Sequence, residues 1–341
     1  MIYATQNHTL QENHINMNND VAAVIVNWNS WDYLIKCITA LQKQTVQFDR
    51  IVVVDNASDE IDYSIITNWP HRVEFIQAPA NLGFAKGNNI AFDFLKAYEF
   101  VALVNPDAYL EKDWLENMLS ASQRYPKIAS FASCLVMANN HNKWDGYGDT
   151  YHISGLAWRN GHGQFLNEKY QIEQDVFSAC AAAALYRFDA LQEAGGFDED
   201  YFCYMEDVDL GFRLRLLGYS CVLVPNAIAY HVGSATTGGE RSDFALYHGH
   251  RNLVWTYIKN MPGFLFWVLL PLHLIMNLVS IIQFVIVGQG LVILRAKWDA
   301  LKGVKLMLCK RKQIQAMRKV SVSDIWRVMD KKILLNASDR T

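Results

Sequence analysis

Short apolar runs alternate with longer amphipathic stretches through the first 140 residues of the chain. Runs rich in β-branched residues predict buried strands, and the stretches between them predict helices. The predicted strands cover about residues 21–26, 50–54, 73–77, 100–104 and 128–137. Predicted helices cover about residues 30–42, capped by Ser30, and 113–124, and the loop Asn81–Asn89 leads into a further helix that ends near Tyr98. This alternation predicts an α/β fold with a mostly parallel sheet flanked by helices.

Polar residues stand at the carboxyl ends of three predicted strands, which is the edge where ligands bind in open parallel sheets. Asn, Asp and Pro are also ordinary turn formers, so each residue alone has a purely structural explanation. Three such strand ends in succession favour a binding site. These residues are Asn27, Asn29, Asp55, Asn56, Asn105 and Asp107.

Two common phosphate-binding loops are absent from the sequence. Asn27-Trp28-Asn29 stands after the first strand in place of G-x-G-x-x-G, and G-x-x-x-x-G-K-[ST] occurs nowhere. A dinucleotide-dependent dehydrogenase and a P-loop NTPase are therefore disfavoured. Asn105-Pro106-Asp107 instead offers a carboxylate at a strand end, a hard oxygen ligand suited to Mg²⁺ or Mn²⁺ bridging two phosphates.

Charges are segregated along a predicted helix that begins near Glu206. The acids Glu206, Asp207 and Asp209 lie at its start, two arginines lie toward its end, and Gly218 follows. Favourable interaction with the helix dipole explains this order. It leaves unexplained why three carboxylates in four residues adjoin so many aromatic residues, where a low dielectric would raise their pKa and suit them to general base catalysis. Both interpretations stay open at this point.

The segment between the sheet and this helix is less regular. Residues 138–175 are rich in Gly and aromatic residues, which is typical of hairpins over a site and equally of a surface excursion. Residues 176–185 are mostly small, which would let a backbone or a sugar approach closely. A strand over residues 219–224 and a second apolar stretch ending in His231 follow, and residues 233–242 have the composition of a flexible lid.

Composition narrows the class of protein and its compartment. The chain has 341 residues and a formal net charge of -3, so no basic field indicates nucleic acid as a partner. Its six cysteines form no C-x-x-C pair and indicate reduced thiols. Residues 1–20 are polar and lack the apolar run of a signal peptide, so we expect them to be a frayed cytoplasmic tail. We expect one domain over residues 21–258 and membrane-associated helices with a basic tail over residues 259–341.

The C-terminal part carries a long uncharged run. No Asp, Glu, Lys or Arg occurs from Asn260 to Leu294, which is long enough for a transmembrane helix. Two features argue against a single span. A polar stripe interrupts the run. The tail beyond it is basic and should stay cytoplasmic like the sheet, whereas a single span would place the two on opposite sides of the membrane. We therefore expect an in-plane amphipathic helix or a re-entrant hairpin, with Trp267 and Trp298 near the interface and the tail on anionic headgroups. A buried helical pair packed on the catalytic domain is the alternative.

Six motifs occur in order and together resemble those of the family 2 glycosyltransferases, most closely the rhamnosyltransferase-like branch. The resemblance covers about residues 20–260 and implies a GT-A fold, a nucleotide-sugar donor and inversion at the anomeric carbon. The motifs are VIVNWN from Val24, VDNASD from Val54, NLGFAKGNN from Asn81, NPD from Asn105, GFDE from Gly196 and EDVDL from Glu206.

The same resemblance implies roles for individual residues. Asp207 matches the catalytic base, and Glu206 would orient the acceptor, while Asp209 would only cap the helix. Asp107 matches the second aspartate of the D-x-D metal motif, and His231 matches a further metal ligand, so a divalent cation (Mg²⁺ or Mn²⁺) is implied. Asn105 departs from the first aspartate of that motif. The residues implied in nucleotide-sugar binding are Asn27, Trp28, Asn29, Asp55, Asn56, Asn81, Gly83, Phe84, Gly87, Asn88, Asn105, Asp107 and Arg251.

The resulting hypothesis is an inverting glycosyltransferase. It would move a sugar, with L-rhamnose from dTDP-rhamnose as the first choice and UDP-sugars as the alternative, to a polyprenyl-linked saccharide at the cytoplasmic face of the inner membrane. A nucleotidyltransferase would carry a basic Gly-rich loop after the first strand, which this chain lacks. An inactive membrane-anchored scaffold stays open because of Asn105.

Overall fold

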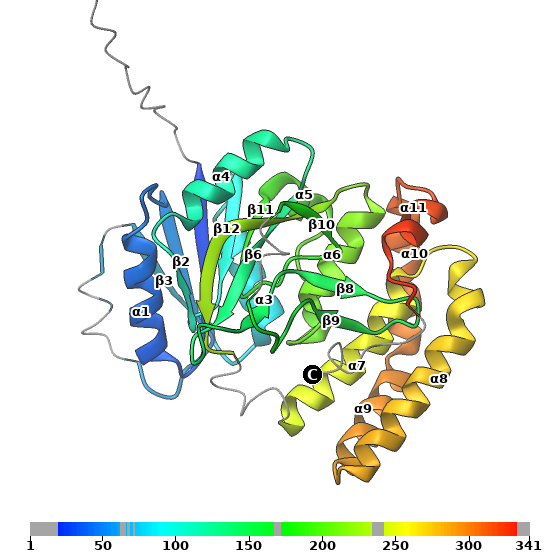
Figure 1. The fold of residues 1–341 in the computed structure, drawn as a ribbon. Helices are drawn as coiled ribbons and strands as arrows, with labels where there is room; N and C mark the ends of the chain where they lie inside the picture. Colours follow the sequence, from blue (N-terminus) through cyan, green and yellow to red (C-terminus); the bar gives the residue numbers. More distant parts are fainter. Residues whose placement is uncertain are drawn as a thin grey trace, which may run out of the picture.

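A computed structural model describes residues 20–61, 66, 69, 70, 72–166, 172–233 and 242–332 of the chain. At its centre lies a mixed sheet with the strand order β10-β12-β6-β11-β4-β1-β2-β3, onto which β5 and β7 also pair (Figure 1). The strands are β1 (Val21–Asn27), β2 (Arg50–Asp55), β3 (Val73–Gln77), β4 (Phe100–Val104), β5 (Ala108–Leu110), β6 (Ser130–Met137), β7 (Trp144–Gly146), β10 (Gln174–Val176), β11 (Ala183–Arg187) and β12 (Cys221–His231).

The first half of the sheet follows the sequence-based prediction. Strands β3, β2, β1 and β4 are parallel neighbours, so their carboxyl ends share one edge, where Asn27 is in register with Asp55. The second half is not mostly parallel as expected, because β11 runs antiparallel between β4 and β6. This antiparallel strand brings the small residues before it to the same edge as the end of β4.

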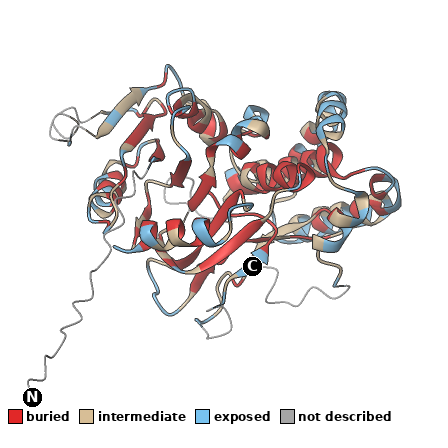
Figure 2. Ribbon diagram, turned by 90° about the horizontal axis from the view of Figure 1, so that it is seen from above, coloured by how far each residue is buried: buried red, intermediate tan, exposed pale blue. Residues whose placement is uncertain are grey.

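Two layers of helices cover the sheet, as its alternating side chains require. Val21, Ala23 and Ile25 of β1 pack with α1 (Trp31–Gln42) and α4 (Trp114–Arg124) on one face. Ala22 and Val24 pack on the other face with α3 (Gly83–Phe92), α5 (Phe188–Glu193) and α6 (Glu206–Leu216). Figure 2 shows the central strands as almost wholly buried.

Several local predictions differ from the structure. Helix α3 ends at Phe92 instead of near Tyr98. Ser30 stands at the start of α1 but does not cap it, because its hydroxyl donates to the carbonyl of Trp28 at 3.0 Å. The strand expected over residues 219–224 continues to His231, with a register shift between Val224 and Ile228 that lets it pair along the whole of β6. The proposed lid lies largely outside the described residues.

The Gly/aromatic segment contains a small hairpin, β8 (Asp149–Tyr151) paired with β9 (Ala157–Arg159). The hairpin packs in a third apolar cluster with the C-terminal helices. These helices are α7 (Asp243–Asn260), α8 (Leu265–Ile286), α9 (Gly290–Lys302), α10 (Val304–Met317) and α11 (Val322–Val328). Figure 1 shows α8 and α9 side by side as an antiparallel pair. The C-terminal region therefore forms a helical hairpin and is neither a free tail nor a single isolated helix.

Helix α8 turns its polar stripe inward and its apolar side outward. Buried His273 stacks on Tyr257 and contacts the carbonyl of Ser154 through Nδ1 at 2.8 Å, whereas Trp267 is 70% exposed. Within the described residues, α8 is the one helix long and apolar enough to cross a membrane, with a mean hydropathy of 2.2. The helical pair therefore packs on the rest of the protein through the inward side of α8, as the alternative requires, and leaves the apolar side of α8 exposed.

The basic tail is also more ordered than expected. Lys297 is buried and donates to the carbonyl of His250 at 3.1 Å, and Lys310 pairs with Asp198 and Asp200. Arg311 donates to the carbonyl of Ile258 at 3.0 Å. Part of the positive charge therefore holds α9 and α10 on the rest of the protein, and only the remaining cations face outward.

Candidate active site

A cleft of about 420 Å³ opens beyond the carboxyl ends of β1 and β4. It brings together ten of the residues singled out in the sequence: Trp28, Asn56, Asn81, Gly83, Phe84, Asn105, Asp107, Glu206, Asp207 and His231. The remaining six do not line it: Asn27, Asn29, Asp55, Gly87, Asn88 and Arg251. For these six, direct contact with a nucleotide-sugar stays a prediction.

Asn27 and Asp55 form a buried network directly behind the cleft wall. The amide of Asn27 donates to Asp55 Oδ1 at 3.0 Å, and the backbone N–H and hydroxyl of Ser58 donate to the same carboxylate. Beside them, the side-chain amide of Asn29 donates to Asp59 Oδ2 at 2.9 Å, and Asn29 Oδ1 accepts from the backbone N–H of Asp59 at 2.8 Å. These contacts fix the loops after β1 and β2, so in this structure the three residues shape the wall on which Trp28 stands.

The loop from Asn81 owes its position to Asn56 and to two glycines. Asn56 Oδ1 accepts from the backbone N–H of Leu82 at 2.9 Å, and its amide donates to Asn81 Oδ1 at 3.0 Å. Gly83 has φ +82°, and a Cβ there would lie 2.5 Å from the carbonyl oxygen of Phe202. A Cβ at Gly87 would lie 2.7 Å from Val26 Cγ1, so α3 packs directly on β1.

The metal motif and the predicted histidine meet on one side of the cleft. Asp107 Oδ1 lies 3.4 Å from His231 Nε2, and β5 pairs with the end of β12 to hold the two residues together. Asn105 Oδ1 is buried and has no hydrogen-bond partner among the described residues, although an unpaired buried oxygen is costly. An amide oxygen, a carboxylate and an imidazole nitrogen suit Mn²⁺ or a related divalent ion. The described residues contain no group of three His, Cys, Asp or Glu side chains that could hold a metal ion.

Asp145 orients this histidine from behind. Its Oδ2 lies 2.8 Å from His231 Nδ1 and accepts from Arg159 at 2.6 Å. Because Asp145 holds the proton on Nδ1, a divalent cation would bind at Nε2, on the Asp107 side, in place of the second proton that the charged imidazole carries there. Burial favours the neutral imidazole, but Asp145 and Asp107 outweigh it and raise the pKa of His231 to about 9.

Glu206 and Asp207 also line the cleft, from the first turn of α6. Glu206 is buried and Asp207 is half-buried, and desolvation raises the pKa of each, with repulsion from Asp207 contributing for Glu206. Asp207 Oδ1 accepts from the backbone N–H of Val208 at 2.8 Å, and Oδ2 accepts from Ala181 at 3.3 Å. Glu206 Oε2 has no partner among the described residues. A desolvated carboxylate held by two N–H groups is a strong base in a fixed position.

The run of small residues lets α6 approach the sheet. A Cβ at Gly211 would lie 2.3 Å from Ser178 Cβ, so only glycine permits this contact. The close approach brings the backbone N–H of Ala181 to Asp207. Of the two explanations for small residues in this run, the structure supports the approach of a backbone.

Asp209 does not serve as a simple helix cap, contrary to the expectation. It is fully buried and lies 2.8 Å from Lys259 Nζ and 2.9 Å from Arg213 Nε. Asn260 donates to the same carboxylate at 2.7 Å. Burial alone would raise the pKa of Asp209, but Lys259 and Arg213 lower it. This network fastens α6 to α7.

The structure adds four cleft residues or supporting residues that the sequence did not single out: Asp145, Asp149, Trp158 and Arg159. All come from the irregular segment around the β8–β9 hairpin, whose Gly/aromatic composition was the only signal in the sequence. The hydroxyl of Ser178 donates to Asp149 Oδ2 at 3.0 Å. Burial and the nearby Asp207 raise the pKa of Asp149 to about 8.

The sequence model of glycosyl transferase family 2 matches residues 22–195, which hold the sheet up to β11, the Asn81 loop and the Asn105–Asp107 motif. The chain belongs to this family. The protein is therefore a glycosyltransferase, and the interpretations as a nucleotidyltransferase or an inactive scaffold are not supported.

Two curated relatives of this glycosyltransferase are rhamnosyltransferases. N-acetylglucosaminyl-diphospho-decaprenol L-rhamnosyltransferase from Mycobacterium tuberculosis is 25% identical over 68% of this chain and 82% of its own length. Rhamnosyltransferase WbbL from Escherichia coli K12 is 27% identical over 62% of this chain and 83% of its own length.

Solved structures confirm the GT-A-like fold of the glycosyltransferase. A mannosyltransferase from Pyrobaculum calidifontis, solved with GDP-Man and Mn²⁺, gives a TM-score of 0.53 at 16% identity and covers 90% of this chain and 87% of its own. GalNAc-T7, solved with UDP, GalNAc and Mn²⁺, gives a TM-score of 0.58 at 14% identity and covers 70% of this chain and 47% of its own.

Proposed function

We propose that this glycosyltransferase moves L-rhamnose from dTDP-rhamnose to a polyprenyl-linked saccharide, with inversion at the anomeric carbon. The observation that carries the proposal is that one cleft is lined both by Asp207 and by Asn105, Asp107 and His231. The rhamnosyltransferase relatives support the choice of donor and of acceptor class.

The residues divide the proposed reaction between them. An acceptor hydroxyl attacks the anomeric carbon from the Asp207 side, Asp207 takes its proton, and the nucleoside diphosphate leaves on the side of Asp107. Burial raises the pKa of Glu206 and so favours its protonated carboxyl group, the form that donates a hydrogen bond to a sugar hydroxyl. Trp28 and Phe84 offer aromatic surface to the donor.

A divalent cation fits the donor side. Asp107, His231 and the amide oxygen of Asn105 would hold it, with Asp145 fixing the histidine tautomer. When bound, it supplies positive charge to the departing diphosphate. Since Asn105 is neutral, the site has one negative ligand, so we expect weaker metal binding without the nucleotide than with it.

The outer side of α8 and α9 suits a membrane surface. Apolar side chains there are exposed in a row along both helices: Trp267, Leu274, Leu278, Ile282, Val285, Leu291, Leu294 and Trp298. Lys302, Lys305 and Lys312 adjoin this face and complement anionic headgroups. We propose monotopic attachment through this hairpin at the cytoplasmic leaflet, with residues 21–258 as the catalytic domain, so that the cleft meets a lipid-linked acceptor.

A donor screen tests the proposed chemistry. The purified full-length protein is incubated with dTDP-rhamnose, UDP-sugars or GDP-sugars and Mn²⁺, and release of the nucleoside diphosphate is measured with and without polyprenyl-diphosphate-linked GlcNAc. We expect dTDP-rhamnose to be used, faster with the acceptor, and the new linkage to be inverted by NMR. Turnover of a UDP-sugar in preference to dTDP-rhamnose would overturn the donor assignment, and no stimulation by the acceptor would overturn the acceptor class.

A further inference from the structure

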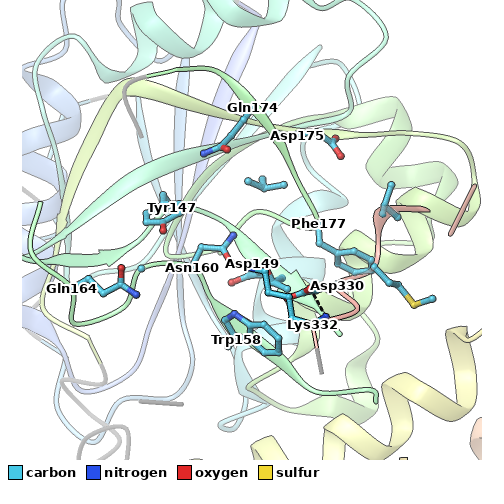
Figure 3. Close-up of a pocket in the computed structure, with 15 residues that line it drawn as sticks. Tyr147, Asp149, Trp158, Asn160, Gln164, Gln174, Asp175, Phe177, Asp330 and Lys332 are labelled. Carbon is cyan, nitrogen blue, oxygen red and sulfur yellow. Dashed lines mark hydrogen bonds between the residues drawn. The ribbon is translucent and has the colours of Figure 1, made fainter. Parts of the chain in front are cut away.

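A second cavity, of about 370 Å³, lies beside the cleft. Asp149 and Trp158 line both, so the β8–β9 hairpin forms the partition between them. Figure 3 shows Asp149, Trp158 and Asn160 grouped on one side of this cavity, with Gln174 and Asp175 on the opposite side. Nothing in the proposed reaction uses this space.

One wall of the cavity comes from the C-terminal segment. Asp330 donates its backbone N–H to the carbonyl of Tyr151 at 2.9 Å and accepts from Ile153 at 3.0 Å. His152 reaches the carbonyl of Lys332 through Nε2 at 3.1 Å. These contacts join residues about 180 positions apart in the chain. The cavity is therefore a built feature that needs both the hairpin and the end of the last helix.

The lining suits a neutral, hydroxyl-rich ligand. Asn160, Gln164 and Gln174 bring side-chain amides, which both donate and accept hydrogen bonds. Tyr147, Trp158 and Phe177 bring aromatic rings, on which the apolar faces of sugars pack. The volume falls in the range of about 300–1,000 Å³ of small-molecule sites.

The charges argue against an anionic ligand. Asp175 is paired with Arg215 at 2.8 Å, and Lys332 is the one cation among the described lining residues, next to Asp330. Burial and Asp207 raise the pKa of Asp149 to about 8, so at neutral pH its carboxyl group is mostly protonated and donates as well as accepts. A nucleoside diphosphate or a lipid diphosphate would find no excess of positive charge here.

We propose that this cavity is a saccharide subsite, which binds a neutral sugar unit of the acceptor other than the unit that receives the transferred sugar. The ligand would pass from the cleft over Trp158 into the cavity. The proposal rests on the proposed function, because it assumes a saccharide acceptor in the cleft. Under this proposal, the residues that line the cavity determine which acceptor saccharides bind and how many sugar units they carry.

Binding without donor tests the subsite. The full-length protein is titrated with a panel of neutral methyl glycosides and disaccharides, followed by saturation-transfer NMR and tryptophan fluorescence. The variant Gln164→Ala/Gln174→Ala is compared with Gln42→Ala/Gln192→Ala, a matched pair outside both cavities. We expect at least one disaccharide to bind the wild type and the control equally. The cavity variant should bind it about fivefold to hundredfold more weakly, because two hydrogen bonds are lost.

The outcomes separate this proposal from the proposed function. Nucleoside diphosphate affinity and donor hydrolysis should be equal in all three proteins, since neither glutamine lines the cleft. Absence of saccharide binding by the wild type, or equal binding by the cavity variant, would overturn the subsite whichever donor is used. Failure of dTDP-rhamnose in the donor screen, with saccharide binding still weakened in the cavity variant, would overturn the donor assignment alone.

Discussion

The side-chain amide of Asn252 donates to the backbone carbonyl of Tyr204 at 2.7 Å, two residues before Glu206. The same buried amide donates to the carbonyls of Tyr201 at 3.0 Å and Cys203 at 2.9 Å. Phe202, Tyr204 and Met205 all have positive φ, which costs about 1–3 kcal/mol for each residue that is not glycine. Asn252 on α7 thus holds a strained turn that aims the first turn of α6 into the cleft.

Replacing Asn252 with Ala should therefore act mainly on kcat, with a smaller effect on the free energy of unfolding. We expect kcat to fall about 10–100-fold, as when a reacting group shifts by about 1 Å, with little change in donor affinity. Thr256→Ala, one turn further along α7, is the matched control, because it removes a buried hydrogen bond to Tyr201 without touching the carbonyls of residues 203 and 204. Equal losses of kcat in both variants would show that Asn252 contributes stability only.

Two neighbouring aspartates on α6 should respond differently to the same change. Asp207→Asn should lower turnover about 10²–10⁴-fold, because an amide cannot accept the proton, while donor affinity stays nearly constant. Asp209→Asn should instead lower the melting temperature, because it leaves Lys259 and Arg213 with a neutral partner in a buried network. Retention of more than about a tenth of wild-type turnover by Asp207→Asn would refute its role as the base.

The hydrogen bond from Asp145 to His231 should matter for metal affinity. We expect Asp145→Asn to weaken Mn²⁺ binding about 10–100-fold, measured by calorimetry with nucleoside diphosphate present, because an amide no longer fixes the histidine tautomer with a negative charge. Asp32→Asn, an exposed substitution on α1, serves as the control. Unchanged Mn²⁺ affinity in the Asp145 variant would contradict the assignment of His231 as a metal ligand and of Asp145 as the residue that orients it.

The raised pKa of Glu206 predicts a pH-dependent loss of stability. In the unfolded chain the glutamate loses its proton near pH 4.3, whereas the folded protein retains it to a higher pH. Between these two values the unfolded state binds fewer protons, so stability falls as pH rises. Glu206→Gln removes this contribution, and its melting temperature relative to wild type should therefore increase from pH 5 to pH 8. A difference that is constant over this range would contradict the prediction.

The sequence predicts the sheet better than it predicts what surrounds the cleft. Strands β1, β2 and β4 are apolar except at their ends because both of their faces are buried, so composition alone locates them. The antiparallel course of β11 depends on tertiary contacts with β4 and β6, which no local pattern encodes. The same holds for Asp145 and Asp149, whose environments are made by residues far away in the chain.

The polar stripe of α8 shows how one pattern permits opposite structures. The stripe includes His273 and Ser280, and an in-plane amphipathic helix would turn it toward water. In the structure both residues face the protein, where His273 contacts the carbonyl of Ser154. Periodicity gives the faces of a helix and leaves open which face meets the solvent. The role of Asp209 is ambiguous in the sequence for a related reason, because a carboxylate suits the start of a helix and equally a buried ion pair.

The exposed apolar face of the α8–α9 hairpin should bind lipid without crossing it. We expect the double variant Leu278→Glu/Ile282→Glu to lose flotation with vesicles of phosphatidylethanolamine and phosphatidylglycerol, while Phe94→Glu, an exposed apolar residue next to α3, floats as wild type does. Cys309 on α10 is the exposed cysteine among those described, so a membrane-impermeant maleimide reports its side. In sealed inner-membrane vesicles it should be labelled from the same face as a cysteine introduced by Asp32→Cys in the catalytic domain. Labelling of the two from opposite faces would show that the hairpin spans the bilayer and would overturn monotopic attachment.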